Sequence, residues 1–143
     1  MKFLCGLVFV SLVVSGCGGD DGGTPTSPTP APTINVPFSA TDLRVGTGAE
    51  ATTGRNVSVR YTLWVYSTTA ADNKGNQLQN GPFNFVVGQG VVPGFSMGVN
   101  GMRVGGLRRV VIPPNLGYGN NPPDSRIRPN ETLLFEIELL AVQ

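Results

Sequence analysis

Apolar and polar positions alternate over the longest regular segment of the chain, between Asn56 and Val65. The apolar series falls on every second residue and comprises Val57, Val59, Tyr61, Leu63 and Val65, with Asn56, Ser58, Arg60, Thr62 and Trp64 between them. Successive side chains of a β-strand point to opposite faces of its sheet. The alternation therefore predicts a long strand that buries one face and exposes the other.

Further segments also have strand character. Phe83–Val87 and Leu107–Ile112 are short apolar runs, and the second is stopped by the pair Pro113–Pro114. Thr132–Val142 alternates again, with inward positions at Leu133, Phe135, Ile137 and Leu139 and outward positions at Glu136 and Glu138. Asp42–Val45 adds a candidate edge strand. Together these segments predict that the chain is mostly β-structure from Phe38 onward.

One segment has helical periodicity instead. Pro93 suits the first helical position, where its ring presets φ and its missing N–H needs no partner. Phe95, Val99 and Met102 recur at i, i+4 and i+7, on one face of about two turns, and Gly105–Gly106 is expected to end the helix. The order of elements predicts an α+β domain over residues 38–143, with an antiparallel sheet wrapped over one helix. Residues 67–81 and 113–130 are expected to form long loops, and loops of that length are usually functional or disordered.

The N-terminus is typical of a secretory signal. Lys2 precedes an apolar run, Phe3–Val14, that is shorter than the roughly 20 residues needed to cross a bilayer. The run ends in Val14-Ser15-Gly16-Cys17, which resembles the lipoprotein box of bacteria, where the Cys becomes the lipidated first residue of the mature chain. The alternative is an ordinary signal peptide that is cleaved near Gly16, with Cys17 incidental.

Residues 18–37 resemble a tether, because they contain five of the 12 prolines and almost no large apolar side chain that could build a core. We expect residues 1–16 to be a signal peptide, residues 17–37 to be a lipidated Cys followed by a flexible Gly/Pro/Thr tether, and residues 38–143 to fold. More than one acyl chain on Cys17 would anchor the protein stably. The expected location is a bacterial membrane of the cell envelope, with the domain facing the periplasm or the exterior.

Composition excludes several classes of chemistry. The net charge is only +1, so nothing indicates a nucleic-acid partner. The chain has no histidine, which excludes general acid–base catalysis by histidine and removes the commonest metal ligand. Both cysteines, Cys5 and Cys17, precede the folded part, and the acidic residues show no ligand spacing. We therefore expect no metal, no cofactor and no covalent intermediate.

Five segments resemble, in order and at similar spacing, the sequence motifs of one family. They are Val59–Thr62, Pro82–Gly88, Val91–Gly105, Ile112–Gly119 and Ile127–Leu140. The third segment carries the Val-x-x-Gly-Phe-x-x-Gly-Val-x-x-Met-x-x-Gly pattern, and the fourth carries Ile-Pro followed by Tyr-Gly. On these motifs the chain resembles the FKBP-type peptidyl-prolyl cis–trans isomerases over residues 42–142.

The resemblance implies a five- or six-stranded antiparallel half-barrel over one short helix, with an apolar active-site cup between helix and sheet. Position by position, it implies that the cup is formed by Tyr61, Phe83, Val91, Val92, Phe95, Tyr118, Ile127 and Phe135. Leu78 and Gln79 fall where the family usually has Phe and Asp, and Phe95 replaces its usual Trp. The partners that it implies are proline-containing polypeptides and macrolide inhibitors, and we expect a monomer.

The departures at Leu78 and Gln79 keep a second function open. With a neutral amide in place of the carboxylate, we expect an isomerase of weakened activity. The alternative is a non-catalytic module that binds proline-containing segments on the same fold. A purely structural surface lipoprotein is a third possibility, against which the preserved cup argues.

Overall fold

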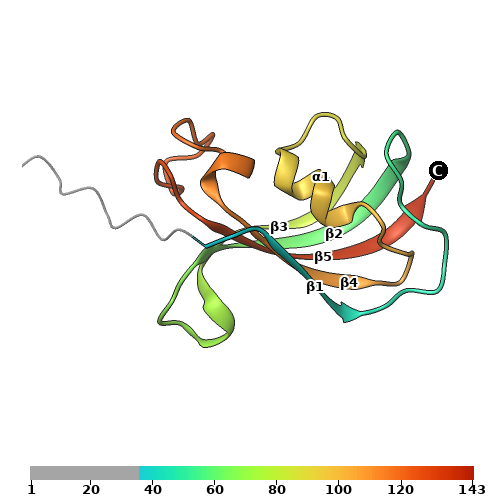
Figure 1. Cartoon of the computed structure of the whole chain (residues 1–143), viewed down its shortest axis with the longest axis horizontal. Coiled ribbons are helices and arrows are strands. Elements are labelled where there is room, and N and C mark those ends of the chain that lie inside the picture. The colour runs from blue at the N-terminus through green and yellow to red at the C-terminus, as the bar shows by residue number, and fades with distance from the viewer. Residues whose placement is uncertain (1–35) are drawn as a thin grey trace, which may run out of the picture. The chain divides into compact units, whose positions relative to one another are not determined.

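The computed structural model describes residues 36–143, which contain five strands and one α-helix (Figure 1). The strands are β1 (Ser39–Arg44), β2 (Asn56–Tyr66), β3 (Lys74–Val86), β4 (Leu107–Ile112) and β5 (Leu133–Val142). The helix α1 spans Pro93–Val99, and two single-turn 3₁₀ helices, η1 and η2, span Ala71–Asn73 and Pro114–Leu116. The predicted signal peptide, Cys17 and most of the tether lie outside the described residues.

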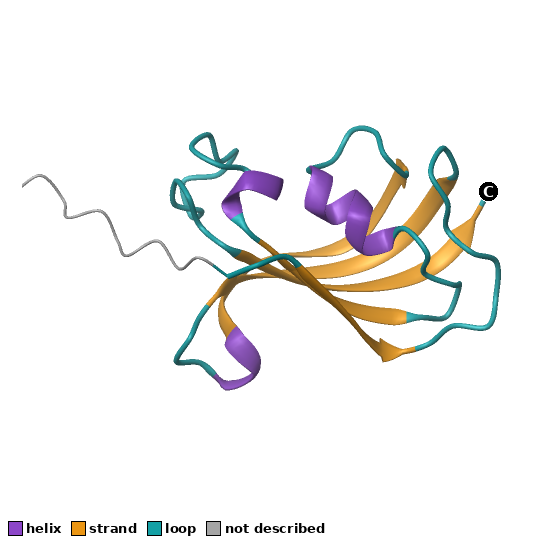
Figure 2. Ribbon diagram, viewed as in Figure 1, coloured by secondary structure: helices purple, strands orange, loops and turns teal. Residues whose placement is uncertain are grey.

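The strands form one open antiparallel sheet in the order β1-β4-β5-β2-β3, so β1 and β3 are its edges. The sheet is strongly twisted, and α1 lies across one of its faces (Figure 2). This arrangement confirms the predicted α+β fold, with five strands and an unclosed sheet. Among the described residues, no helix is long and apolar enough to cross a membrane.

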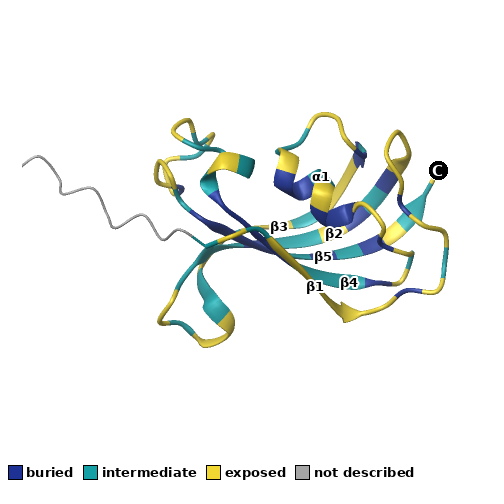
Figure 3. Ribbon diagram, viewed as in Figure 1, coloured by how far each residue is buried: buried dark blue, intermediate teal, exposed yellow. Residues whose placement is uncertain are grey.

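The core lies between α1 and the inner face of the sheet. Inward residues of the three central strands are fully buried, including Val59, Val110, Ile137 and Leu139. Phe95 and Val99 of α1 belong to the same buried hydrophobic cluster. Figure 3 shows buried residues on α1 and along the strands beneath it. The predicted alternation in β2 and β5 is therefore confirmed.

The helix lies very close to β4 because glycine occupies the two positions that face this strand. A Cβ atom on Gly94 would lie 2.5 Å from Cγ2 of Ile112, and one on Gly98 would lie 2.7 Å from Cγ2 of Val110. The two glycines are four residues apart and therefore share a helix face. Their absent side chains place the first turn of α1 directly above the sheet.

The predicted end of the helix is wrong. The helix stops at Val99 rather than continuing to Gly105–Gly106, because Gly101 takes φ of +81° and turns the chain away. Met102 is still buried, with 2% exposure, but it reaches the core from the segment after the helix. Tertiary packing, and not helical periodicity, accounts for its apolar character.

The predicted long loop at residues 67–81 is also wrong. Strand β3 begins at Lys74, well before the predicted Phe83, and Tyr66 pairs with Lys74 across the hairpin. The first half of β3 is largely polar because it is an edge strand that is held by main-chain pairing to β2. No apolar alternation marks such a segment in the sequence. The loop at residues 113–130 does occur, with η2 near its start.

Candidate active site

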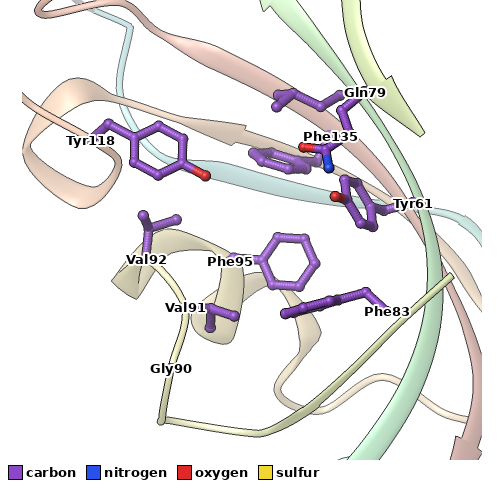
Figure 4. A pocket seen from close by; sticks show the side chains of 10 residues that line it. Tyr61, Gln79, Phe83, Gly90, Val91, Val92, Phe95, Tyr118 and Phe135 are labelled. Carbon is purple, nitrogen blue, oxygen red and sulfur yellow. The ribbon is translucent and has the colours of Figure 1, made fainter. Parts of the chain in front are cut away.

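A cavity of about 520 Å³ opens between the inner face of the sheet and the start of α1 (Figure 4). We call it the cup. Its lining is mostly apolar and aromatic and comprises Tyr61, Leu63, Gln79, Phe83, Gly90, Val91, Val92, Phe95, Tyr118 and Phe135. A pocket of this size that combines apolar walls with a few polar atoms is the usual form of a ligand site.

Strand alternation brings the sheet side of the cup together. Tyr61 and Leu63 are two residues apart on β2 and therefore share its inner face. Leu63 pairs with Phe135 of β5 on one side and with Gln79 of β3 on the other. Phe83 lies further along β3, where it is 38% exposed at the open edge of the sheet.

Phe95 of α1 is the centre of an aromatic cluster beneath the cup. Its ring lies edge-on to the rings of Phe135, Phe85 and Tyr61, with centroid separations of 5.1, 5.3 and 5.8 Å. Phe83 stacks on Phe85 at 5.6 Å. Edge-to-face pairs of this kind add to the stability gained from burial alone. The cluster therefore gives the cup a rigid apolar floor.

The segment before α1 forms a second wall. Gly90 takes φ of +71°, which turns the chain so that Val91 and Val92 reach the cup. Val92 is the N-cap of α1, and its carbonyl accepts hydrogen bonds from the N–H groups of Phe95 and Ser96. The Ser96 hydroxyl in turn accepts a hydrogen bond from the Gly88 N–H at 3.0 Å, which holds the turn in place. No described residue accepts a hydrogen bond from the Val92 N–H.

Two tyrosine hydroxyls point toward the cup, from β2 and from the loop after η2 (Figure 4). Burial raises the pKa of Tyr118, and burial followed by the nearby Tyr118 raises the pKa of Tyr61. Both hydroxyls therefore stay protonated at neutral pH and are available as hydrogen-bond donors. Within the described part of the chain, the Tyr118 hydroxyl has no hydrogen-bond partner. It is free to donate to a bound molecule.

The loop that carries Tyr118 is closed on itself by main-chain hydrogen bonds. The Gly119 N–H donates to the Pro114 carbonyl at 3.0 Å, and the Asn130 N–H donates to the Gly119 carbonyl at 2.8 Å. Ile127 is 5% exposed and belongs to the core beneath this loop. The loop therefore presents Tyr118 from a fixed base.

The described residues contain no group of three or more acidic, cysteine or histidine side chains that could hold a metal ion. A family model matches the part of the chain that forms the cup. Residues 48–140 match the family described as FKBP-type peptidyl-prolyl cis-trans isomerase. The chain belongs to this family. The assignment confirms both the resemblance found in the sequence and the enzyme class that it implied.

Individual FKBP relatives agree with the family assignment. An FK506-binding protein of Neisseria meningitidis is 40% identical over 101 residues, which is 71% of this chain and 92% of the relative. A chloroplastic peptidyl-prolyl cis-trans isomerase of Arabidopsis thaliana, FKBP16-4, is 42% identical over 108 residues, 71% of this chain. The matched region spans only 46% of the Arabidopsis protein.

Solved FKBP structures share the fold. FkpA from Escherichia coli aligns with a TM-score of 0.63 and 31% identity, over 74% of this chain and 48% of that chain. The peptidyl-prolyl cis-trans isomerase of Pseudomonas syringae aligns with a TM-score of 0.63 and 30% identity, over 74% of this chain and 75% of that chain. The FKBP fold is thus established by sequence and by structure.

The structure brings most of the predicted FKBP site residues together. The predicted residues that line the cup are Tyr61, Phe83, Val91, Val92, Phe95, Tyr118 and Phe135, together with Gln79. Ile127 and Leu78 pack beside the cup, against the core, without lining the cavity. The catalytic roles expected of eight of these residues, and the substrate-binding roles expected of Leu78 and Gln79, stay predictions.

Sequence reasoning missed two residues of the lining, Leu63 and Gly90. The alternation of β2 could have found Leu63, because it lies two residues from Tyr61 on the same face. Gly90 contributes through its backbone conformation, which apolar patterning does not reveal.

Proposed function

We propose that this chain catalyses rotation about X–Pro bonds in polypeptide clients by holding the proline in the apolar cup. One observation carries the proposal: the cup combines a floor of buried aromatic rings with hydroxyl groups that stay neutral. Isomerisation makes and breaks no covalent bond, so the absence of histidine from the chain is no obstacle.

The apolar lining favours the transition state over the planar ground state. A planar amide is stabilised by charge separation between oxygen and nitrogen, which underlies the barrier of about 18–20 kcal/mol. Twisting the bond removes that resonance and makes the amide less polar. A site lined by Phe83, Phe95 and Phe135 stabilises the twisted form relative to the planar form, which is the requirement for catalysis by differential binding.

Two donors at the rim position the peptide. The Val92 N–H, which no described residue uses, is placed to donate to a carbonyl of the substrate. The Tyr118 hydroxyl provides a second donor from the opposite loop. Orienting the peptide and excluding water contribute to an acceleration that, for a factor of about 10⁶, requires about 8 kcal/mol.

Binding without turnover is the second candidate, and Gln79 is the observation that favours it. Gln79 lines the cup but has a neutral amide where the family resemblance implies a carboxylate. A neutral group accepts a hydrogen bond but adds no charge to the local field. An X–Pro peptide assay with the full chain separates the candidates, if affinity for the same peptide is measured alongside. Tight binding of the peptide without acceleration of its isomerisation would identify the chain as a non-catalytic binding module.

We further propose poor affinity for macrolides and a preference for bulky apolar residues before the proline. Leu78 keeps apolar area near the cup but lacks the aromatic face of Phe, and Phe95 lacks the indole N–H of Trp. Competition between FK506 and an X–Pro peptide tests the first point, and a peptide series that varies the residue before proline tests the second.

The N-terminal pattern supports a lipid anchor on Cys17. In this proposal cleavage after Gly16 makes Cys17 the first residue, and residues 18–37 hold a monomeric domain away from a bacterial membrane. Mass spectrometry of membrane-extracted protein should find acyl mass on an N-terminal Cys17. A mature protein without acyl mass, starting at another residue, would contradict the anchor and leave the isomerase proposal untouched.

A further inference from the structure

We propose that Arg126 is a positioning residue for the cup, because its guanidinium ties the loop that carries Tyr118 to the part of β3 that carries Gln79. We call this link the arginine strap; it consists of Asp124, Arg126 and the carbonyl of Leu78. The inference rests on the proposed function and deepens it, since it assigns a role in the same site to a residue outside the cavity.

The strap attaches to β3 at an irregularity of the strand. Leu63 of β2 pairs with Gln79, but the next residue, Trp64, pairs with Gln77, so Leu78 is an extra residue between them. Such a bulge bends a strand, leaves the extra residue outside the regular ladder and redirects the neighbouring side chain. The side chain redirected here is that of Gln79, which lines the cup.

Arg126 binds the bulge directly. Its Nη1 donates to the Leu78 carbonyl at 2.9 Å. Its Nε donates to both carboxylate oxygens of Asp124, at 3.1 and 3.0 Å, and its main-chain N–H donates to Oδ1 at 2.9 Å. Hydrogen bonds from Arg126 lower the pKa of Asp124 to about 2, so the pair stays ionised at neutral pH. Asp124 thus orients the guanidinium toward Leu78.

Within the described residues, this is the only side-chain hydrogen bond that joins residues 117–130 to β3. The two ends of the strap lead to opposite walls of the cup. On one side Leu78 directly precedes Gln79. On the other side Arg126 belongs to the loop that carries Tyr118. Figure 4 shows Tyr118 and Gln79 on different sides of the cavity. The strap therefore sets the separation of these two walls.

A surface hydrogen bond that sets this separation acts on peptide binding more than on rotation. The aromatic floor does not include Arg126, so it stays intact when the strap is cut. We expect Arg126→Ala to raise KM and lower kcat/KM by about threefold to tenfold, the effect of one hydrogen bond, with kcat nearly unchanged. Arg126→Lys keeps a donor that can reach the same carbonyl and should restore most of the loss.

The matched control is Arg128→Ala in the full chain. Arg128 is an exposed arginine of the same loop. Among the described residues its one hydrogen bond runs from its main-chain N–H to the carboxylate of Glu131. The Arg128→Ala variant loses the same positive charge as Arg126→Ala but keeps the strap, so its KM should equal that of the wild type. The melting temperature of each variant should be measured as well, to establish that the variant is folded under the assay conditions.

A double-mutant cycle identifies the residue through which Arg126 acts. If the strap works by placing the Gln79 side chain, Arg126→Ala should lower kcat/KM far less in a Gln79→Ala background than in the wild type. Additive losses would overturn the proposal. So would equal KM values for Arg126→Ala and Arg128→Ala, or a loss that Arg126→Lys fails to restore.

A binding measurement separates failure of the strap from failure of the proposed function. The affinity of each variant for an X–Pro peptide, followed with the Gln79 main-chain amide in NMR spectra, needs no turnover. If the wild type binds without isomerising, the isomerase proposal fails, while weaker binding and a shifted Gln79 amide in Arg126→Ala still support the strap. Unchanged affinity and an unshifted amide would overturn it.

Discussion

Neighbouring residues of β5 lie in two very different surroundings. Phe135 points into the cup, where its ring centroid is 5.1 Å from that of Phe95. The next residue, Glu136, lies on the opposite, outer face of the sheet and forms ion pairs with Lys74 at 2.8 Å and Arg109 at 2.9 Å. The same alternation in β2 places Tyr61 in the cup and the next residue, Thr62, on the outer face.

The outer face is not uniformly polar. Leu134 is fully buried although it faces away from the main core, and the side chain of Lys74 lies 4.7 Å above the ring of Trp64, to which Leu134 is paired. Glu138 forms an ion pair with Arg44 at 2.7 Å that is more exposed to solvent than the ion pairs of Glu136. The hairpin segment around η1 folds toward this face (Figure 1).

The comparison teaches how one sheet separates stability from function. The inner face leaves a cavity of about 520 Å³ unfilled, which a domain selected for stability alone would close. Around Glu136 the outer face instead carries the ion pairs with Lys74 and Arg109, so we expect its contacts to serve the fold. Substitutions on the inner face should therefore change activity, and those on the outer face should change stability alone.

The largest expected effect is that of Phe135→Ala. The side chain belongs both to the core and to the cup floor, so we expect loss of turnover and destabilisation by about 3–5 kcal/mol. Denaturant unfolding and an X–Pro peptide assay measure the two effects. The control is Leu140→Ala on the same strand, where the side chain is 39% exposed and the change should be small. Retained activity in a folded Phe135→Ala variant would break the proposed link between the inner face and function.

Tyr118→Phe should change activity without changing stability. It keeps the ring and removes one hydrogen bond to the peptide, worth about 0.5–1.5 kcal/mol, so kcat/KM should fall by about tenfold or less. The control is Tyr66→Phe at the end of β2, outside the cup, which should leave kcat/KM unaltered. Complete loss of turnover in folded Tyr118→Phe would instead mean that the hydroxyl takes part in chemistry.

Restoring the residues implied by the family should sharpen the inner face. The double variant Leu78→Phe and Gln79→Asp adds an aromatic face beside the cup and a charge in its wall. We expect kcat/KM to rise by about twofold to tenfold, the gain from roughly one aromatic contact. An unchanged or lower kcat/KM, measured with the same peptides, would show that these departures do not limit the enzyme.

The smallest effect on function is expected on the outer face. Burial alone would raise the pKa of Glu136, but hydrogen bonds from Lys74 and Arg109 outweigh it, and the pKa is lowered from its ordinary value. This carboxylate therefore stabilises the fold above the ordinary pKa, and the contribution is lost as the pH falls through the lowered value. Glu136→Gln should destabilise by about 1 kcal/mol near neutral pH, with kcat/KM unchanged.

Glu138→Gln is the matched control for this prediction, because the Glu138 side chain is more exposed than that of Glu136, at 30% against 18%. It should have the smaller effect on unfolding free energy. As the pH falls below the lowered pKa of Glu136, the wild type and Glu136→Gln should approach equal stability. A constant difference across pH, or a fall in kcat/KM, would contradict the separation between the two faces.

The sequence predicted the inner face better than the edges. Alternation identified the inward residues of β2 and β5, such as Tyr61 and Phe135, because burial on one face leaves a period of two in the sequence. The first half of β3 was missed, since an edge strand held by main-chain hydrogen bonds needs no apolar pattern. The helix end was missed because Met102 is buried by tertiary packing.

The cup was predictable only through the family motifs, and the arginine strap beside it was not predictable at all. Phe83 and Phe95 are ordinary core residues by their pattern, and only the resemblance placed them around a cavity. The bulge at Leu78 and the contact of Arg126 with its carbonyl depend on register and on a loop conformation, neither of which leaves a periodic signal. These are the features for which the structure was necessary.

The pH profile of kcat/KM for an X–Pro peptide tests the central claim most directly. If a neutral apolar cup performs the rotation, the full chain should accelerate isomerisation, with kcat/KM constant between about pH 6 and 9, because the cup has no histidine and the tyrosine pKa values are raised above their ordinary value. A bell-shaped profile centred near neutral pH would contradict the account, and so would the absence of any acceleration.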